Sequence, residues 1–136
     1  MNDTTDTRQQ ILEAAMERIV HYGYSKTTMS EIAKDCNMSA GNIYRFFASK
    51  LDIAEAIGRK FNSELYQTYA SICRKPITAA DRLRQFFEFS MVRTYEALEE
   101  KDKLVELAET LADERPLFMN EQLAQERVYL VQILEN

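Results

Sequence analysis

Hydrophobic residues recur at helical spacing along most of the chain, with polar residues between them. The first apolar stripe predicts a helix from near Thr7 to just before Gly23. A glycine directly after such a stripe is typical of a helix C-terminal cap, so we expect the chain to turn there. The members of the stripe are Ile11, Leu12, Ala15, Met16, Ile19 and Val20.

Two very short helices are predicted next. The letters TMSE at residues 28–31 fit a capping box, in which a threonine hydroxyl and a glutamate satisfy free amides reciprocally. Asn37 tolerates a left-handed backbone, and Ser39 can cap a second short helix. Helices shorter than about 12 residues are marginal alone in water, so both must pack against their neighbours. Their inward positions are Ile32, Ala33 and Cys36, and then Ile43 with Phe46 or Phe47.

Four further helices follow. Ser49 can cap a long helix that continues until Pro76, and Thr78 can open the next one. A short helix is predicted around residues 104–111, and Pro116 suits the first turn of a last helix. Their inward positions are Ala54, Ile57, Phe61, Leu65, Tyr69 and Ile72; Leu83, Phe86, Phe87, Met91 and Leu98; Leu104, Leu107 and Leu111; and Leu123, Leu130, Val131 and Leu134. The last stripe reaches Asn136 without a cap, which leaves open that the chain is a fragment.

Composition agrees with this all-α prediction of seven helices. The 136 residues include only 3 Gly and 2 Pro, and 46% are hydrophobic, which is enough to bury a core. We expect a three-helix helix-turn-helix unit over residues 1–48. A second helical domain is expected over residues 49–136.

Charge separates the same two regions. The whole chain carries −5, but residues 1–50 contain six basic and six acidic side chains, so the excess of acid lies in residues 51–136. A near-neutral N-terminal part can bind phosphate if its cations face one way, whereas the acidic remainder would be repelled by a polyanion. Nucleic acid, if bound, is therefore expected at the N-terminal part.

Several classes of function are disfavoured. Cys36 and Cys73 stand far apart with His21 as the single histidine, so we expect no metal site, no disulfide and no cofactor. Enzyme motifs such as HExxH, a phosphate loop or a nucleophile elbow are missing from the sequence, so we do not expect an enzyme. No signal peptide or membrane-length apolar run is present, and we expect a cytoplasmic protein.

The second short helix carries the candidate chemistry. Small residues at its start let the backbone approach another surface closely, and first-turn amides and hydroxyls can hydrogen-bond phosphates. Asn42 is suited to pair with an adenine edge, and Tyr44 and Lys50 to reach phosphates; the alternatives are a solvated Asn42, a core Tyr44 and a solvated Lys50. The predicted DNA-binding residues are Thr27, Thr28, Ser39, Ala40, Gly41, Asn42, Tyr44, Arg45 and Lys50.

Residues 23–57, GYSKTTMSEIAKDCNMSAGNIYRFFASKLDIAEAI, resemble the N-terminal DNA-binding segment of the TetR family of bacterial transcriptional regulators. The resemblance covers about residues 8–56 and rests on the family's spacing of Gly23, Thr27, Thr28, Ile32, Ala33, Ser39, Gly41, Ile43, Tyr44, Phe47 and Lys50. It implies a recognition helix at about residues 40–46, a homodimer on palindromic double-stranded DNA, and repression relieved by a small molecule. A regulator of this kind is associated with the nucleoid when it is bound to its operator.

This sequence departs from the family pattern in three ways. Asn37 replaces the usual glycine of the turn. Phe46 stands at a position that is aromatic or histidine in the family, and here it is expected to pack rather than to contact phosphate. Family members are usually longer, and their last two helices build the dimer. The resemblance therefore implies that residues 49–136 are a helical effector-binding and dimerisation domain that is incomplete at its C-terminus, and dimerisation of this chain is expected to be weakened or lost. The other function considered is a helical adaptor that binds a protein through its acidic surface without binding DNA.

The effector site is predicted on the helix that follows Thr78. Pockets for small molecules are mostly apolar with a few polar groups, and this helix is rich in aromatic residues. We therefore expect an apolar or aromatic effector, with core packing as the alternative role of the same side chains. The predicted effector-binding residues are Phe86, Phe87, Phe89, Met91 and Tyr95.

Overall fold

The computed structural model describes residues 3–100 and 102–135, and within these residues it contains seven helices and no strand. Their bounds are α1 Asp3–Tyr22, α2 Met29–Asp35, α3 Ala40–Ile43, α4 Lys50–Cys73, α5 Ala79–Glu100, α6 Asp102–Glu114 and α7 Pro116–Glu135. The predicted all-α fold is confirmed.

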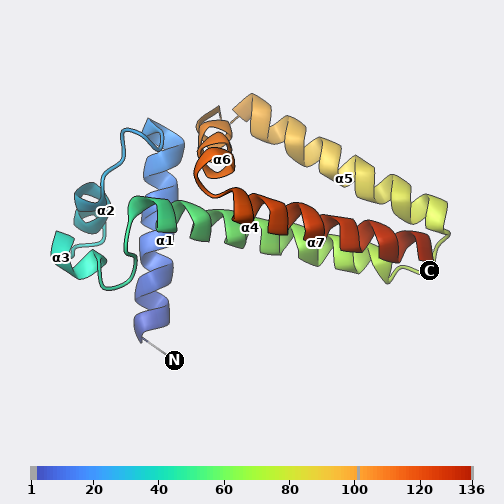
Figure 1. Ribbon diagram of the computed structural model, residues 1–136, viewed down its shortest axis with the longest axis horizontal. Helices are drawn as coiled ribbons and strands as arrows, with labels where there is room; N and C mark the ends of the chain where they lie inside the picture. Colours follow the sequence, from blue (N-terminus) through green and yellow to red (C-terminus); the bar gives the residue numbers. More distant parts are fainter. Residues whose placement is uncertain (1–2, 101, 136) are drawn as a thin grey trace.

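The helices form two groups that share α4 (Figure 1). α1, α2 and α3 cluster at one end of the molecule, whereas α4 and α7 run side by side away from that cluster, with α5 beside α7. α6 lies where the groups meet and packs against α1, α4, α5 and α7. α6 is therefore in contact with both groups.

Local capping explains where most helices begin. The Thr28 hydroxyl accepts a hydrogen bond from the Glu31 amide at 3.2 Å, and the Glu31 carboxylate accepts one from the Thr28 amide at 3.1 Å, which completes the predicted capping box. Ser39, Ser49 and Thr78 accept equivalent bonds from amides three residues later. These starts agree with the sequence prediction because each depends only on residues within one turn.

Two predicted helix bounds were wrong. α1 begins at Asp3 rather than near Thr7, since the polar residues before the apolar stripe also adopt the helix and the acidic Asp6 lies in its N-terminal part. α3 ends at Ile43, whereas the expected recognition helix ran to about residue 46. The amides of Arg45 and Phe46 bond carbonyls three residues back, so the chain tightens into turns there.

Two buried clusters form the core. The first joins the N-terminal group to α6 and α7: it contains Ile19, Ile32, Ile43 and Ile53 together with Leu107, Leu111 and Phe118. The second contains Tyr69, Ile72, Phe86 and Ile133 at the far end of α4, α5 and α7. The first cluster crosses the predicted domain boundary between residues 48 and 49, and that boundary stays a prediction.

Candidate nucleic-acid interface and effector cavity

The turn between α2 and α3 is compact. Asn37 has a φ of 57°, the left-handed conformation expected where glycine is common, and the Met38 amide donates to the Ala33 carbonyl at 3.0 Å. Met29, Ile32 and Ala33 of α2 and Ile43 of α3 are buried. The two short helices are therefore held by packing against the core.

Arg18 of α1 braces α2 from outside. Its Nε lies 2.7 Å from the Asp35 carboxylate and its Nη1 lies 3.0 Å from Glu31. The hydrogen bond from Arg18 holds the pKa of Asp35 below its usual value. All three side chains are partly exposed, so the pairs orient α2 more than they stabilise the fold.

The start of α3 is a small, polar and accessible surface. Ser39, Ala40, Gly41 and Arg45 are exposed, and Tyr44 is 53% exposed. A methyl group added at Gly41 would meet nothing within 4 Å. Asn42 is half-buried, and its side-chain oxygen accepts a bond from Arg45 at 3.4 Å. The structure thus places the predicted residues Ser39, Ala40, Gly41, Asn42, Tyr44 and Arg45 around the start of α3, and all of them except the half-buried Asn42 are exposed.

Thr27 does not belong to that surface. It is 0% exposed, and its hydroxyl donates to the Gly23 carbonyl at 2.8 Å. The predicted phosphate contact of this hydroxyl is therefore corrected, because the group is buried and used within the turn before α2. Its neighbour Thr28 is exposed.

Lys50, at the first residue of α4, is held in an internal contact. Its ammonium donates to the Tyr24 carbonyl at 2.9 Å and lies 4.1 Å from the centre of the Tyr24 ring. Burial lowers the pKa of Lys50, while the nearby Glu106 carboxylate raises it. A phosphate contact by Lys50 requires these interactions to be released or shared, and it stays a prediction.

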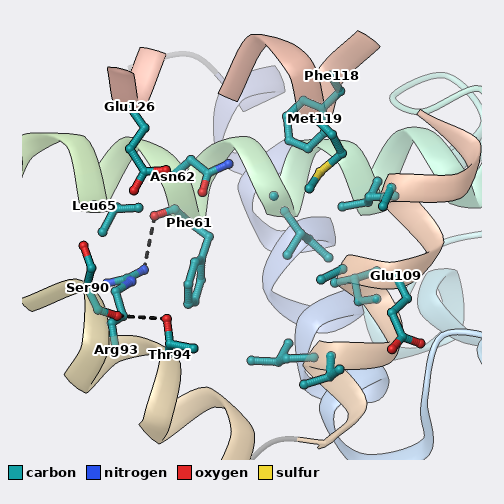
Figure 2. Close-up of a pocket in the computed structure, with 18 of the residues that line it drawn as sticks. Phe61, Asn62, Leu65, Ser90, Arg93, Thr94, Glu109, Phe118, Met119 and Glu126 are labelled. Atoms are coloured by element: carbon teal, nitrogen blue, oxygen red, sulfur yellow. Dashed lines mark hydrogen bonds between the residues drawn. The ribbon is translucent and has the colours of Figure 1, made fainter. Parts of the chain in front are cut away.

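A cavity of about 570 Å³ lies between α1, α4, α5, α6 and α7, within the usual size of small-molecule sites (Figure 2). Its walls are mainly apolar, with polar side chains gathered toward α5. The lining residues include Met16 from α1; Gly58, Phe61, Asn62 and Tyr69 from α4; Ser90, Arg93 and Thr94 from α5; Leu104, Glu109 and Leu111 from α6; and Phe118, Met119 and Glu126 from α7.

None of the five predicted effector residues lines this cavity, and their role in effector binding stays a prediction. Phe86 is 2% exposed and stacks on Tyr69 with ring centres 4.1 Å apart, and Phe89 packs against the same core cluster. Phe87, Met91 and Tyr95 face solvent, with Met91 70% exposed. The predicted residues do not line the cavity because α5 has more than one apolar stripe, and periodicity alone does not say which stripe faces the cavity.

The cavity-facing side of α5 is more polar than the sequence reasoning expected. Ser90, Arg93 and Thr94 stand at i, i+3 and i+4, and Leu98 follows on the same side. The signal that would have found this side is its group of polar residues at helical spacing between aromatic ones. Sequence reasoning searched for apolar residues and therefore missed it.

The polar end of the cavity is a hydrogen-bonded group. The Tyr69 hydroxyl lies 2.5 Å from the Ser90 hydroxyl and donates to Glu126 at 3.2 Å. Burial raises the pKa of Tyr69, so the phenol stays neutral near neutral pH. Arg93 donates to the Phe61 carbonyl at 3.3 Å, and its guanidinium lies 4.1 Å from the centre of the Phe61 ring.

α6 touches the cavity and the N-terminal group at once. Leu104 and Leu111 line the cavity, while the Glu106 carboxylate accepts a hydrogen bond from the Ser25 amide at 3.3 Å. Ser25 lies in the turn that follows Gly23, whose φ is +94°. α6 therefore contacts both the cavity and the turn that leads into α2.

Among the described residues, no group of three or more His, Cys, Asp or Glu side chains is placed to hold a metal ion. Within the same part of the chain, each helix is too short or too polar to cross a membrane.

Residues 11–57 match the family model described as bacterial regulatory proteins of the tetR family. The chain is 43% identical over 51 residues to the uncharacterized HTH-type transcriptional regulator YvkB of Bacillus subtilis, a match that covers 38% of this chain and 27% of that protein. The name of that relative describes a transcriptional regulator, the class of protein that the sequence resemblance implies.

Solved structures extend the similarity to the C-terminal helices. KstR2 of Mycobacterium tuberculosis, a ketosteroid transcriptional regulator, aligns with a TM-score of 0.68 at 26% identity over 94% of this chain and 66% of its own. FadR of Thermus thermophilus, a transcriptional repressor in complex with lauroyl-CoA, aligns with a TM-score of 0.69 at 22% identity and the same coverage. The chain thus spans less than two thirds of the length of both proteins.

Proposed function

We propose that this chain, whose residues 11–57 belong to the tetR family of bacterial regulatory proteins, is a transcriptional regulator that binds double-stranded DNA and releases it when a small molecule fills the cavity. The observation that carries the proposal is the accessible start of α3. Its small and polar residues project from a unit whose inner side is fully packed. Such a surface suits close approach to a DNA groove.

The contacts are divided between phosphate and base. Thr28, Ser39, Tyr44 and Arg45 bind the backbone, since hydroxyl and guanidinium groups are suited to phosphate oxygens. Ala40 and Gly41 let the backbone of α3 approach closely, and Asn42 pairs with an adenine edge in the major groove. Lys50 adds a phosphate contact if its bond to Tyr24 opens, and Thr27 supports the turn from inside.

The regulatory step uses the shared helices. Two copies read a palindromic site, with recognition helices matched to successive major grooves about 34 Å apart. A ligand between α4, α5, α6 and α7 shifts α4 and α6, which changes that separation and lowers DNA affinity. By linkage, operator DNA weakens ligand binding by the same factor. The complex of T. thermophilus FadR with lauroyl-CoA and the ketosteroid regulator KstR2 support a small-molecule response.

Fluorescence anisotropy with the duplex upstream of the chain's own gene tests the proposal. Affinity for that duplex should exceed affinity for a scrambled duplex, and both should fall steeply between about 50 and 200 mM salt. Asn42→Ala should cost roughly 1–3 kcal/mol, mainly on the upstream duplex. Asn120→Ala, at an exposed position of α7, is the matched control.

Two results would contradict the proposal. Equal loss by Asn42→Ala on both duplexes would remove the base contact from the mechanism. Weak binding that does not respond to salt would favour the adaptor function, because an apolar helical interface depends little on ionic strength.

A further inference from the structure

The cavity is asymmetric along its length. Toward α6 and the start of α7 its walls are apolar, including Leu104, Leu111 and Phe118, whereas toward α5 it presents Ser90 and Arg93 (Figure 2). A molecule that occupies both ends must be apolar over most of its length and polar at one end, because buried polar groups need partners.

Arg93 is preorganised at the polar end. Stacking on the Phe61 ring and the hydrogen bond to the Phe61 carbonyl fix its guanidinium. Among the side chains that the structure describes, Arg93 forms no ion pair with a carboxylate. A guanidinium has five N–H donors in a planar fork that matches a carboxylate, so one carbonyl contact leaves donors for a ligand.

The two carboxylates that line the cavity are less suited than Arg93 to bind a charged group of a ligand. Glu126 already accepts a hydrogen bond from the Tyr69 hydroxyl, which the Ser90 hydroxyl also contacts. Glu109 is exposed on α6, across the cavity from Arg93 (Figure 2). At the polar end, the Glu126 carboxylate therefore has a hydrogen-bond donor, whereas the Arg93 guanidinium has no carboxylate partner among the described side chains.

We propose that the cavity binds an amphiphilic anion, with an apolar body toward α6 and a carboxylate-like group paired with Arg93. The role of this ligand as the effector of the chain rests on the proposed function, whereas its binding to the cavity does not. The apolar body extends toward Met16, the residue of α1 in the cavity wall. One ligand therefore contacts α1, α4 and α6 together.

Three probes with one alkyl chain and different ends test the charge assignment. Decanoate, decanol and decylammonium are titrated into the full chain by isothermal titration calorimetry, below the concentrations at which they form micelles. Decanoate should bind tightest. Arg93→Gln should weaken decanoate about tenfold, because a charge-assisted pair is lost, and should leave decanol within about twofold.

Two variants control for indirect effects. Arg84→Gln changes an exposed arginine of α5 that pairs with Asp81 outside the cavity, so decanoate affinity should be unchanged. Arg93→Lys keeps the positive charge and should restore part of the affinity lost in Arg93→Gln. Thermal melting followed by circular dichroism establishes that each variant is folded at the titration temperature.

Other outcomes overturn the assignment. Tighter binding of decylammonium that is lost in Glu126→Gln would mean a cationic ligand, and equal weakening of all three probes by Arg93→Gln would mean a structural role for Arg93. Absence of binding by all three would also reject it.

Anisotropy on the same preparations keeps the two proposals separate. A preference for the upstream duplex without decanoate binding rejects only the ligand class, whereas decanoate binding without a preference for the upstream duplex rejects only DNA binding.

Discussion

The helix-turn-helix unit and the cavity region are built from contacts of different range. In the unit, Thr28 and Ser39 each cap a helix within three residues, and Asn37 sets the turn by its own backbone conformation. The cavity instead joins side chains from Met16 to Glu126 across five helices. The comparison shows that one region is organised mainly by local chemistry and the other by packing between distant segments.

The largest expected effect tests whether the two regions share one core. Phe118 of α7 is 3% exposed and belongs to the cluster that also contains Ile32 and Ile43. Phe118→Ala should lower the free energy of unfolding by about 3–5 kcal/mol in urea denaturation, because it leaves a cavity in that cluster. Leu117→Ala, at a position 78% exposed, should change it by less than about 0.5 kcal/mol.

A single transition in that experiment would agree with a shared core. Two separate transitions, with α1 to α3 stable after the loss of Phe118, would show that the regions fold independently.

A local contact should have a smaller effect. Thr28→Ala removes the hydroxyl of the capping box and should cost about 1 kcal/mol of stability, again measured in urea. Ser30→Ala lies within α2 at an exposed position and is the matched control. Equal losses from the two substitutions would mean that capping does not explain where α2 begins.

Substitutions at two glycines distinguish an effect on DNA affinity from an effect on stability. Gly41→Ala places a methyl group in open space on α3, so stability should stay the same or rise by about 0.5–1 kcal/mol while DNA affinity falls. Gly58→Ala would bring its methyl within 3.0 Å of the Phe118 ring and 3.2 Å of Leu111, and should be the less stable variant. Undiminished DNA affinity in Gly41→Ala would contradict close approach by α3.

The helix-turn-helix unit and the contact between α4 and α7 should also lose stability at opposite ends of the pH scale. Burial raises the pKa of Tyr66 to about 12, so its contribution is present below the ordinary tyrosine value of about 10 and is lost as pH rises to about 12. Asp35 has a lowered pKa, mainly through its bond to Arg18, so its contribution is present above the ordinary aspartate value of about 3.9 and is lost as pH falls.

Urea denaturation across pH measures both effects. Tyr66→Phe should reduce the alkaline loss, and Arg18→Gln should reduce the smaller acid loss. If each variant keeps the wild-type pH profile, Tyr66 and the Arg18–Asp35 pair do not contribute to stability as described.

The amino-acid sequence by itself determined the all-α class, most helix starts and the helix-turn-helix segment. Caps at Thr28, Ser39 and Ser49 and the left-handed Asn37 depend on neighbours within a few residues, so a local pattern is enough to predict them. The ends of α1 and α3 were less predictable, because helix ends are set by small energy differences.

Only the tertiary structure decided which groups are available for function. Packing buried the Thr27 hydroxyl, directed Lys50 to the Tyr24 carbonyl, and turned Ser90 and Arg93 rather than Phe87 toward the cavity. A helix with several apolar stripes has several possible inward faces, and its choice depends on the total area buried against all neighbouring helices. That buried area depends on residues far apart in the chain, so a local sequence pattern cannot predict it.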